Sequence, residues 1–191
     1  MLFYDAHNHL QDERFAGRQD ELVSAARSAG VAGMVVNGSC EADWPAVLDL
    51  AQRHPGFVVP SFGYHPWYLG ERTPHWRERL VEMLTAAPSA VGEIGLDRWK
   101  PRLPYADQEE VFLAHMQIAA ERNLPVSIHC LQAWGRLVEL LERGPRPACG
   151  FLLHSFGGSL EVAERLAPLG AYFSLPGYYA HEREARQRKV F

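Results

Sequence analysis

The sequence predicts an α/β protein, a (β/α)8 TIM-type barrel whose eighth strand is absent from the 191 residues given. Two observations predict this class. Short apolar runs alternate with longer amphipathic stretches along the whole chain, and such alternation is typical of βαβ units that share a parallel sheet. No glycine-rich phosphate loop follows the first apolar run, which removes one reason to prefer a doubly wound open sheet, the competing interpretation.

We expect strands at the apolar runs and helices at the amphipathic stretches. The stretch Asp107–Arg122 is the clearest helix, because its apolar residues recur at helical spacing. The strand candidates are Leu2–Tyr4, Gly33–Val36, Phe57–Phe62, Ala90–Gly92, Pro125–Ile128, Gly150–Leu153 and Ala171–Leu175. The helical stretches lie near 19–29, 41–53, 74–86, 107–122, 132–142, 158–168 and 181–190.

The length of the chain predicts one domain, residues 1–191. The point at which the sequence stops suggests that this domain is incomplete at its C-terminus. A complete barrel of this kind typically takes about 250 residues and eight strands. The chain stops inside the seventh helical stretch, at 186–191. Because an open barrel leaves unpaired strand edges, we expect a fragment rather than a natural seven-stranded protein.

Composition narrows the function classes. A net charge of -4 argues against binding nucleic acid mainly through a basic surface. Three cysteines without a CxxC pair argue against a disulfide framework or zinc ribbon, so we expect a reducing, cytoplasmic location. No signal peptide and no apolar run of about 18 residues occurs, so no membrane association is indicated. No obligate protein partner is indicated either.

The first chemical motif is Asp5-Ala6-His7-Asn8-His9, at the end of the first strand candidate. If the strand continues, its alternate side chains point to one face, so His7 and His9 could share a metal ion. Asp5 could orient one of the rings. The alternative is a polar turn with incidental histidines.

The second motif is Gly92-Glu93-Ile94-Gly95-Leu96-Asp97. Glu93 directly follows a short apolar run, and the flanking glycines allow other groups to approach closely. A buried carboxylate without a partner would be costly. Asp97 could be an outer group of a metal site or a helix cap, and the alternative for Glu93 is a surface turn.

His129 and His154 each end a later apolar run. In a parallel barrel the strand ends converge on one face, where active sites lie. The joint set of four histidines and Glu93 exceeds a tetrahedral zinc site and fits two divalent ions, with Glu93 placed to bridge them. Zinc, manganese, nickel, iron and magnesium are the candidate metals.

His65 follows the third strand candidate, within Gly63-Tyr64-His65-Pro66-Trp67. We interpret it as a group that contacts substrate or phosphate rather than a metal ligand, and the alternative is a structural turn. Four aromatic residues near strand ends could line a pocket or pack in the core. They are Trp67, Trp99, Trp134 and Phe156.

Taken together, these motifs resemble the TatD family of metal-dependent hydrolases in the amidohydrolase superfamily. The resemblance runs from Tyr4 to about Gly177 and also includes His154-Ser155-Phe156-Gly157-Gly158. It implies a (β/α)8 barrel and a site with two metal ions. His7 and His9 would bind one ion, His129 and His154 the other, and Glu93 would bridge them. It also implies hydrolysis of phosphoester bonds, with His65 near the substrate phosphate.

Two features depart from the family pattern. The family ends its eighth strand with Glu-Thr-Asp, whose Asp binds metal and acts on the catalytic water, and this motif is absent here. The Arg and acid that follow the fifth-strand histidine in the family are replaced by Leu131 and Gln132. Asp97 is a poor substitute for the missing acid by position.

The leading hypothesis is a divalent-metal-dependent hydrolase that cleaves phosphoester bonds, a deoxyribonuclease whose substrate is DNA or a small phosphoester. Glu93, His65 and Asp97 are its candidate catalytic residues. Two alternatives stay open. One is hydrolysis of an amide, ester or lactone on the same site, and the other is a non-catalytic metal-binding module.

Overall fold

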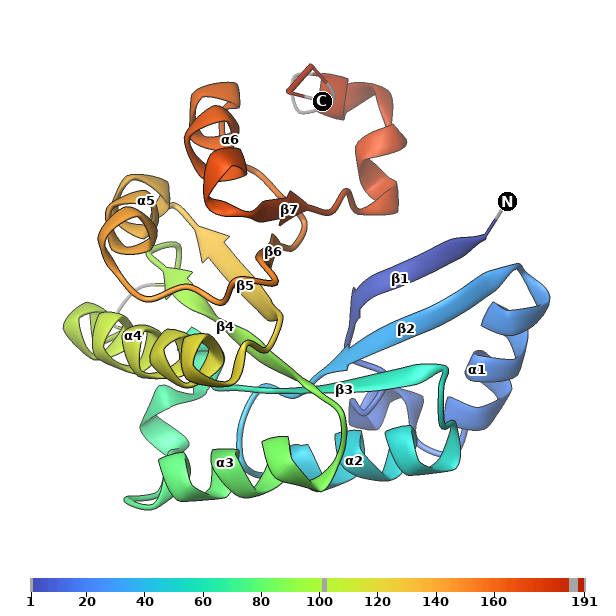
Figure 1. The fold of residues 1–191 in the computed structure, drawn as a ribbon. Coiled ribbons are helices and arrows are strands. Elements are labelled where there is room, and N and C mark those ends of the chain that lie inside the picture. The colour runs from blue at the N-terminus through green and yellow to red at the C-terminus, as the bar shows by residue number, and fades with distance from the viewer. Residues whose placement is uncertain (1, 101–102, 186–188, 191) are drawn as a thin grey trace. The chain divides into compact units, whose positions relative to one another are not determined.

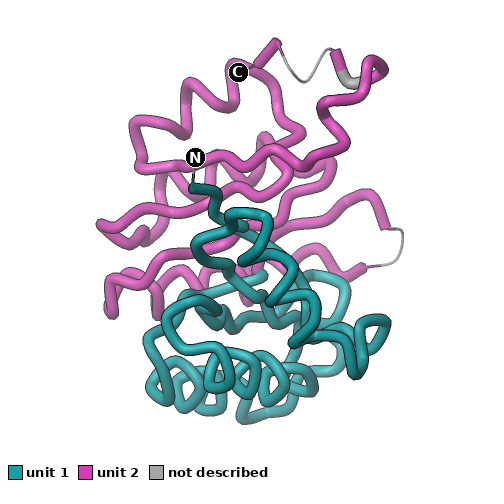
Figure 2. The backbone as a smooth tube through the Cα atoms, turned by 90° about the vertical axis from the view of Figure 1, so that its right-hand side faces the viewer, with its two compact units in different colours: residues 1–93 teal, residues 94–191 magenta. Residues whose placement is uncertain are grey.

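The structure is a computed structural model that describes residues 2–100, 103–185 and 189–190. The chain divides into two compact units, residues 1–93 and residues 94–191, which are coloured separately in Figure 2. Both units alternate strands with helices along the chain. The prediction of a single domain over 1–191 stays a prediction.

Unit 1 is a parallel sheet with helices packed on it (Figure 1). Helix α1 packs against β2, and α2 and α3 pack against β3. Its strands are β1 (Phe3–Asn8), β2 (Val31–Asn37), β3 (Val58–Phe62) and the first half of β4 (Ala90–Asp97), paired in chain order. Its helices are α1 (Gln19–Ser28), α2 (Trp44–Arg53) and α3 (Trp76–Ala86), with short 3-10 helices η1 (Glu13–Phe15) and η2 (Pro66–Glu71) after β1 and β3.

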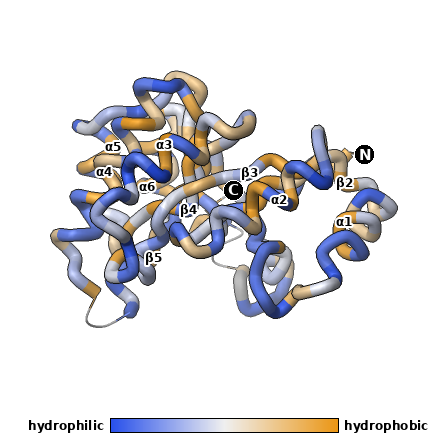
Figure 3. The backbone as a smooth tube through the Cα atoms, turned by 90° about the horizontal axis from the view of Figure 1, so that it is seen from below, coloured by the Kyte–Doolittle hydropathy of each residue, from blue (hydrophilic) through white to orange (hydrophobic). Residues whose placement is uncertain are grey.

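Helix α2 illustrates how the sequence directs this packing. Pro45 occupies its first turn, where the missing N–H costs no helical hydrogen bond. Its buried residues Trp44, Val47 and Leu50 recur every third position, which gives the helix one apolar face. The alternation of hydrophobic and hydrophilic residues along α2 can be followed in Figure 3.

Unit 2 continues the same pattern. The second half of β4 leads into β5 (Val126–Leu131), β6 (Phe151–Leu153) and β7 (Ala171–Phe173), and the last three strands pair in parallel. Its helices are α4 (Tyr105–Arg122), α5 (Trp134–Arg143) and α6 (Leu160–Leu166). Its 3-10 helices are η3 (Ala167–Leu169), η4 (Gly177–Ala180) and η5 (Glu182–Glu184).

Gly95 allows the end of β4 to lie against β5. Its φ of +151° is rare for other residues, and a Cβ there would lie 1.9 Å from the carbonyl oxygen of His129. The N–H of Arg98 then donates to the carbonyl of Leu131 at 2.9 Å. The predicted close approach beside a glycine of this motif is therefore confirmed at Gly95.

The predicted fold class is confirmed: parallel strands alternate with helices, and the described residues contain seven strands, as expected. The predicted ends of the first, fourth, fifth and seventh strands are wrong. β1 runs on to Asn8, β4 to Asp97 and β5 to Leu131, whereas β7 already ends at Phe173. The predicted ends of β4 and β5 lie just before the first ionisable residue, yet every residue of β4 is buried, because its carboxylates have partners inside the protein.

The expected helix over 181–190 is only partly present in its described part, where Glu182–Glu184 form the 3-10 helix η5 and Ala185 is α-helical, but residue 181 is not helical and residues 189–190 form a turn. His181 has an extended backbone, with φ of -68° and ψ of 145°, and it separates η4 from η5. Residues 186–188 and 191 of that expected helix lie outside the described residues. Among the helices that the structure describes, none is long and apolar enough to cross a membrane.

Candidate metal centre

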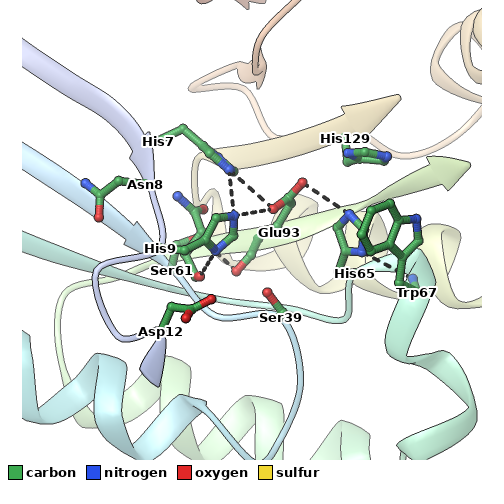
Figure 4. Close-up of polar contacts among 12 residues, drawn as sticks. His7, Asn8, His9, Asp12, Ser39, Ser61, His65, Trp67, Glu93 and His129 are labelled. Atoms are coloured by element: carbon green, nitrogen blue, oxygen red, sulfur yellow. Dashed lines mark hydrogen bonds and ion pairs between the residues drawn. The ribbon is translucent and has the colours of Figure 1, made fainter. Parts of the chain in front are cut away.

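Three predicted metal ligands of unit 1 converge on one point (Figure 4). His9 Nε2 lies 2.9 Å and His7 Nε2 lies 3.3 Å from the same oxygen of Glu93, Oε2. The two imidazole nitrogens are 3.2 Å apart. All three atoms belong to side chains at the sheet, from β1, the residue after it, and β4. A divalent ion that replaced the protons between them would find three ligand atoms already gathered.

The main chain of β2 fixes the ring of His9. His9 Nδ1 lies 2.8 Å from the carbonyl oxygen of Asn37, the last residue of β2, and a carbonyl can only accept. Nδ1 therefore carries a proton, and in the neutral ring Nε2 keeps the lone pair that a metal needs. Burial disfavours the charged ring, but the Glu93 carboxylate outweighs it, so the pKa of His9 is raised above 6.5.

His65 faces the other oxygen of Glu93. His65 Nε2 lies 3.5 Å from Glu93 Oε1, and His65 Nδ1 accepts a hydrogen bond of 3.2 Å from the N–H of Trp67. The neutral ring therefore carries its proton on Nε2. Both side chains are buried. The neutral ring of His65 thus differs from that of His9 in its tautomer, and it presents a donor where the neutral His9 ring has a lone pair.

Asp5 contacts its own strand. Its carboxylate accepts hydrogen bonds from the N–H of His7 at 3.2 Å and from Nδ2 of Asn8 at 2.9 Å. The pairing of β1 with β2 shifts register between Asp5 and Asn8, so simple alternation of side chains does not hold there. The role of Asp5 in orienting a ring stays a prediction.

Unit 2 contains the other two predicted ligands, His129 and His154. Their ring centroids are 5.6 Å apart. His129 lies inside β5, whereas His154 directly follows β6, and its N–H donates to the carbonyl of Ile128. His129 Nε2 lies 3.0 Å from Asp97 Oδ2, and both side chains are buried. Asp97 therefore contacts a predicted ligand, which supports the interpretation of Asp97 as an outer group.

Asp97 is held rigidly at the end of β4. Its other oxygen, Oδ1, accepts from the N–H groups of Trp99 and Lys100 at 2.8 and 3.0 Å. The buried side chain of Gln108 on α4 bonds both the N–H and the carbonyl of Asp97. The carboxylate is thereby fixed with one oxygen toward the main chain and one toward His129. The alternative role of Asp97 as a helix cap is wrong, because its carboxylate closes the turn after β4, whereas α4 begins at Tyr105 with Pro104 at its N-cap.

The chemistry of the donors bears on whether a metal ion fits. Imidazole nitrogen and carboxylate oxygen together are ligands for borderline divalent ions. In unit 1, Glu93 is 2% exposed and its carboxylate meets three imidazole nitrogens, an arrangement that a cation would stabilise. In unit 2, two imidazoles lie beside a buried carboxylate. The residues present therefore fit an ion in unit 1, whereas an ion held by the histidines of unit 2 stays a prediction.

A cavity of about 590 Å³ opens beside the unit 1 ligands. Some residues that line it were missing from the predicted site, notably Gln11, Asp43 and Tyr68. Gln11 Nε2 donates to the Asn37 carbonyl at 2.7 Å and to Asp43 at 3.0 Å, and so links them. Burial raises the pKa of Asp43. Asn37 ends a strand and could have been found by the rule that found Glu93, although it acts through its main chain, which carries no sequence signal.

The two positions that depart from the family pattern lie at the end of β5. Leu131 is its last residue and is exposed. Gln132 follows with φ of 54°, a left-handed turn conformation. His54, His75, His115 and His181 belong to helices or their ends, as expected for histidines outside the site.

Comparison with known families and sequences gives a consistent result. A family model described as TatD related DNase matches residues 4–191. The 3'-5' ssDNA/RNA exonuclease TatD of Pantoea vagans is 31% identical over 185 residues, which are 94% of this chain and 70% of that protein. The protein of the same name from Edwardsiella piscicida is 32% identical over 180 residues, 92% of this chain and 68% of that protein.

Solved structures of TatD homologues agree with the family match. YJJV, a TatD homologue from Escherichia coli K12, superposes with a TM-score of 0.91 at 29% identity, covering 98% of this chain and 73% of its own. A TatD family hydrolase from Entamoeba histolytica gives a TM-score of 0.79 at 19% identity, covering 92% of this chain and 65% of its own, and shows the shared fold.

Proposed function

This chain belongs to the TatD related DNase family of metal-dependent hydrolases, and from that premise we propose that it is an exonuclease that removes nucleotides from the 3' end of single-stranded DNA or RNA. The observation that carries the proposal is the convergence of His7, His9 and Glu93 beside a cavity within one unit. The curated relatives that are named for this activity support the choice of substrate.

Two divalent ions are part of the proposal. His7, His9 and Glu93 would hold one, a choice supported by contacts of 2.9 and 3.3 Å among their ligand atoms. His129 and His154 would hold the other, a choice supported by their adjacent rings. That Glu93 is shared by both ions stays a prediction of the family resemblance. Zinc, manganese, nickel, iron and magnesium all remain candidates.

The protein's own groups would prepare the phosphodiester for attack. Bound divalent ions lower the pKa of a water molecule and stabilise charge on phosphoryl oxygens. His65, with its proton on Nε2, would donate a hydrogen bond to a phosphoryl oxygen and so stabilise the negative charge that grows there. The N–H of Trp67 holds this tautomer in place, and Glu93 Oε1 lies within 3.5 Å of His65 Nε2.

Asp97 would act on His129 rather than on substrate. Its carboxylate contacts His129 Nε2 and is itself fixed by Trp99 and Lys100. We propose that it positions the imidazole and raises its basicity, as carboxylates commonly do behind metal-binding histidines. A cytoplasmic location also stays a proposal.

The direct test is digestion of labelled oligonucleotides. Purified protein loaded with manganese, zinc, nickel or magnesium is incubated with single-stranded DNA and RNA that carry a 5' fluorophore. We expect a ladder of products that shorten from the 3' end, and a 3' phosphorothioate linkage should block it. Glu93→Gln is the inactive control.

Other outcomes would overturn the proposal. No shortening of either oligonucleotide with any of these metals would contradict it. Internal cleavage of a circular single strand would show an endonuclease instead. Hydrolysis of an ester, amide or lactone in a parallel panel, without cleavage of oligonucleotides, would assign the same residues to carbonyl chemistry.

A further inference from the structure

The cavity of unit 1 has an aromatic wall whose use the metal chemistry does not explain. Its volume of about 590 Å³ lies within the roughly 300–1,000 Å³ typical of small-molecule sites. Glu93 and His9 line it, so the cavity reaches the metal ligands. Trp67 and Tyr68, neighbours on η2, line it as well. A ligand in this cavity would therefore touch both the metal ligands and two aromatic side chains.

Both aromatic rings are accessible and close to the group that would contact phosphate. Trp67 is 37% exposed and Tyr68 is 36% exposed. The Trp67 ring lies edge-on to His65 at 5.1 Å between centroids, and the Tyr68 ring lies at 6.1 Å. Figure 4 shows Trp67 beside His65. A nucleotide whose phosphate contacts His65 would thus place its base within reach of these rings.

The charge of the cavity wall points to the base rather than the backbone as the binding determinant. The lining includes one arginine and four acidic residues: Asp12, Glu13, Asp43 and Glu93. The arginine, Arg14, donates from Nε and Nη2 to the two carboxylate oxygens of Asp12, at 2.9 Å each. Affinity through phosphate contacts needs unpaired positive charge. Base stacking does not, because every base has a π face.

The segment that carries the two rings is held at both ends by one carboxylate. Glu41 accepts from Tyr64 Oη at 2.5 Å, before η2, and from the N–H and hydroxyl of Thr73 at 2.9 Å, after it. Burial opposes ionisation of Glu41, but these hydrogen bonds outweigh it and lower its pKa. Tyr64 is itself buried, edge-on to Trp44 and Trp76. The segment that carries Trp67 and Tyr68 is therefore ordered before a ligand binds, which reduces the entropic cost of binding.

We propose that Trp67 and Tyr68 form a stacking subsite for the nucleobase next to the scissile phosphate. The inference rests on the proposed function and adds a specificity: the subsite accepts any of the bases but discriminates against a nucleotide that lacks one. Trp67 supplies the larger stacking surface, and Tyr68 extends it. Arg14 takes little part, because its guanidinium is occupied by Asp12.

The test removes the ring and the base separately. Trp67→Ala, Trp67→Phe and the native protein are assayed on single-stranded oligonucleotides whose 3'-terminal nucleotide is either normal or an abasic tetrahydrofuran. For the normal substrate, Trp67→Ala should raise KM about 5- to 150-fold, because stacking on one base contributes about 1–3 kcal/mol and about 1.4 kcal/mol corresponds to a factor of ten. Trp67→Phe should retain most of the affinity. For the abasic substrate, the native protein and Trp67→Ala should have the same KM.

Matched controls separate stacking from damage to the fold. Tyr172→Ala removes an exposed aromatic ring of β7, 65% exposed, and should change KM for neither substrate. Metal content and the thermal midpoint of Trp67→Ala should equal those of the native protein. If Trp67→Ala raised KM equally for the normal and the abasic substrate, the stacking subsite would be wrong.

Failure of the proposed function is distinguishable from failure of this inference. If the native protein cleaved neither oligonucleotide, the exonuclease proposal would fail. The subsite would then be decided by binding of the same two oligonucleotides to manganese-loaded protein, measured by fluorescence anisotropy. Weaker binding of the normal oligonucleotide alone by Trp67→Ala supports the subsite, and equal binding by the variant and the native protein overturns it.

Discussion

The two units orient their predicted metal-binding histidines by different means. In unit 1, a main-chain carbonyl holds His9, and the Glu93 carboxylate that meets His7 and His9 is itself a predicted ligand. In unit 2, His129 meets Asp97, a carboxylate anchored to the main chain of the following turn. In unit 1 the carboxylate that contacts the histidines, Glu93, is therefore itself a predicted ligand. In unit 2 the carboxylate, Asp97, instead supports a histidine that is a predicted ligand.

This difference predicts which substitutions would disturb the predicted ligands of each unit. Loss of a side chain cannot remove the carbonyl of Asn37, so the orientation of His9 is resistant to substitution at position 37. The orientation of His129 is exposed to substitution at position 97, because the side chain of Asp97 contributes to it. In unit 1 the sensitive point is the ligand itself, Glu93. We therefore expect the largest losses at Glu93 and graded losses at Asp97.

Glu93→Gln should have the largest effect. The amide keeps the shape but removes the charge that meets His7 and His9, so activity should fall about 10³-fold or more, since a bound ion contributes several kcal/mol to transition-state stabilisation. Metal content, measured by mass spectrometry of gel-filtered protein, tests the predicted sharing of Glu93. If Glu93 is shared, both ions are lost or weakened, whereas His9→Ala and His129→Ala should each lose one. Loss of a single ion in Glu93→Gln would contradict the sharing.

Gly95→Ala should have the next largest effect, on stability. Its Cβ would lie 1.9 Å from the carbonyl oxygen of His129, and both partners are main chain in adjacent strands. We expect a loss of about 3 kcal/mol or more in the free energy of unfolding, and a thermal midpoint lowered by roughly 10 °C. Gly33→Ala is the matched control in unit 1, because its Cβ would meet its nearest atom at an ordinary 3.5 Å. Equal midpoints for the two variants would refute this account of the β4–β5 approach.

Asp97→Asn should have a smaller effect that is confined to the metal of unit 2. The amide can still accept from Trp99 and Lys100 but no longer presents a charge to His129. Loss of such a partner typically weakens metal affinity about 10- to 100-fold. Titration with zinc or manganese, followed by calorimetry, should show one weakened site and one native site. Glu164→Gln, an exposed acid of α6, should leave both sites unchanged. A uniform loss at both sites would assign Asp97 a general structural role.

The sequence was sufficient for the fold class and for three side chains that lie together, because both depend on side-chain chemistry at regular positions. His7, His9 and Glu93 were found as polar groups at the ends of apolar runs, and they do converge. The strand boundaries were wrong where a charged residue is buried: Glu93 lies inside β4, because imidazoles compensate its charge there. In the sequence alone, a charged residue inside a buried strand is misread as the end of that strand when its compensating partner is far away along the chain.

What the sequence could not predict depends on main-chain atoms and on distant pairs. The carbonyl of Asn37 orients His9 from 28 positions away, and Glu41 reaches Thr73 from 32 positions away. Neither contact leaves a periodic or compositional pattern. Tyr68 was missed for a related reason: only the turn of η2 shows that it shares the cavity with Trp67.

The smallest expected effect concerns the cysteines. Their reactivity measures how well the residues near the predicted ligands of unit 1 and of unit 2 are shielded from solvent. Cys40 lines the unit 1 cavity and Cys130 follows His129, and both are buried, whereas Cys149 is exposed. Burial raises the pKa of Cys40, and it raises the pKa of Cys130 to about 12, so only about 10⁻⁴ of the Cys130 thiol is ionised at pH 8.

Because the thiolate is the reactive form, iodoacetamide at pH 8 should modify Cys149 first in the native protein and leave activity unchanged. Peptide mass spectrometry over time measures the order, and Cys149→Ser should abolish the early modification. In unfolded protein all three cysteines should react at similar rates. If Cys130 reacted as fast as Cys149 in the native protein, the strand that holds His129 would be open to solvent. The contrast between the carboxylate that supports His129 in unit 2 and the main-chain carbonyl that supports His9 in unit 1 would then no longer hold.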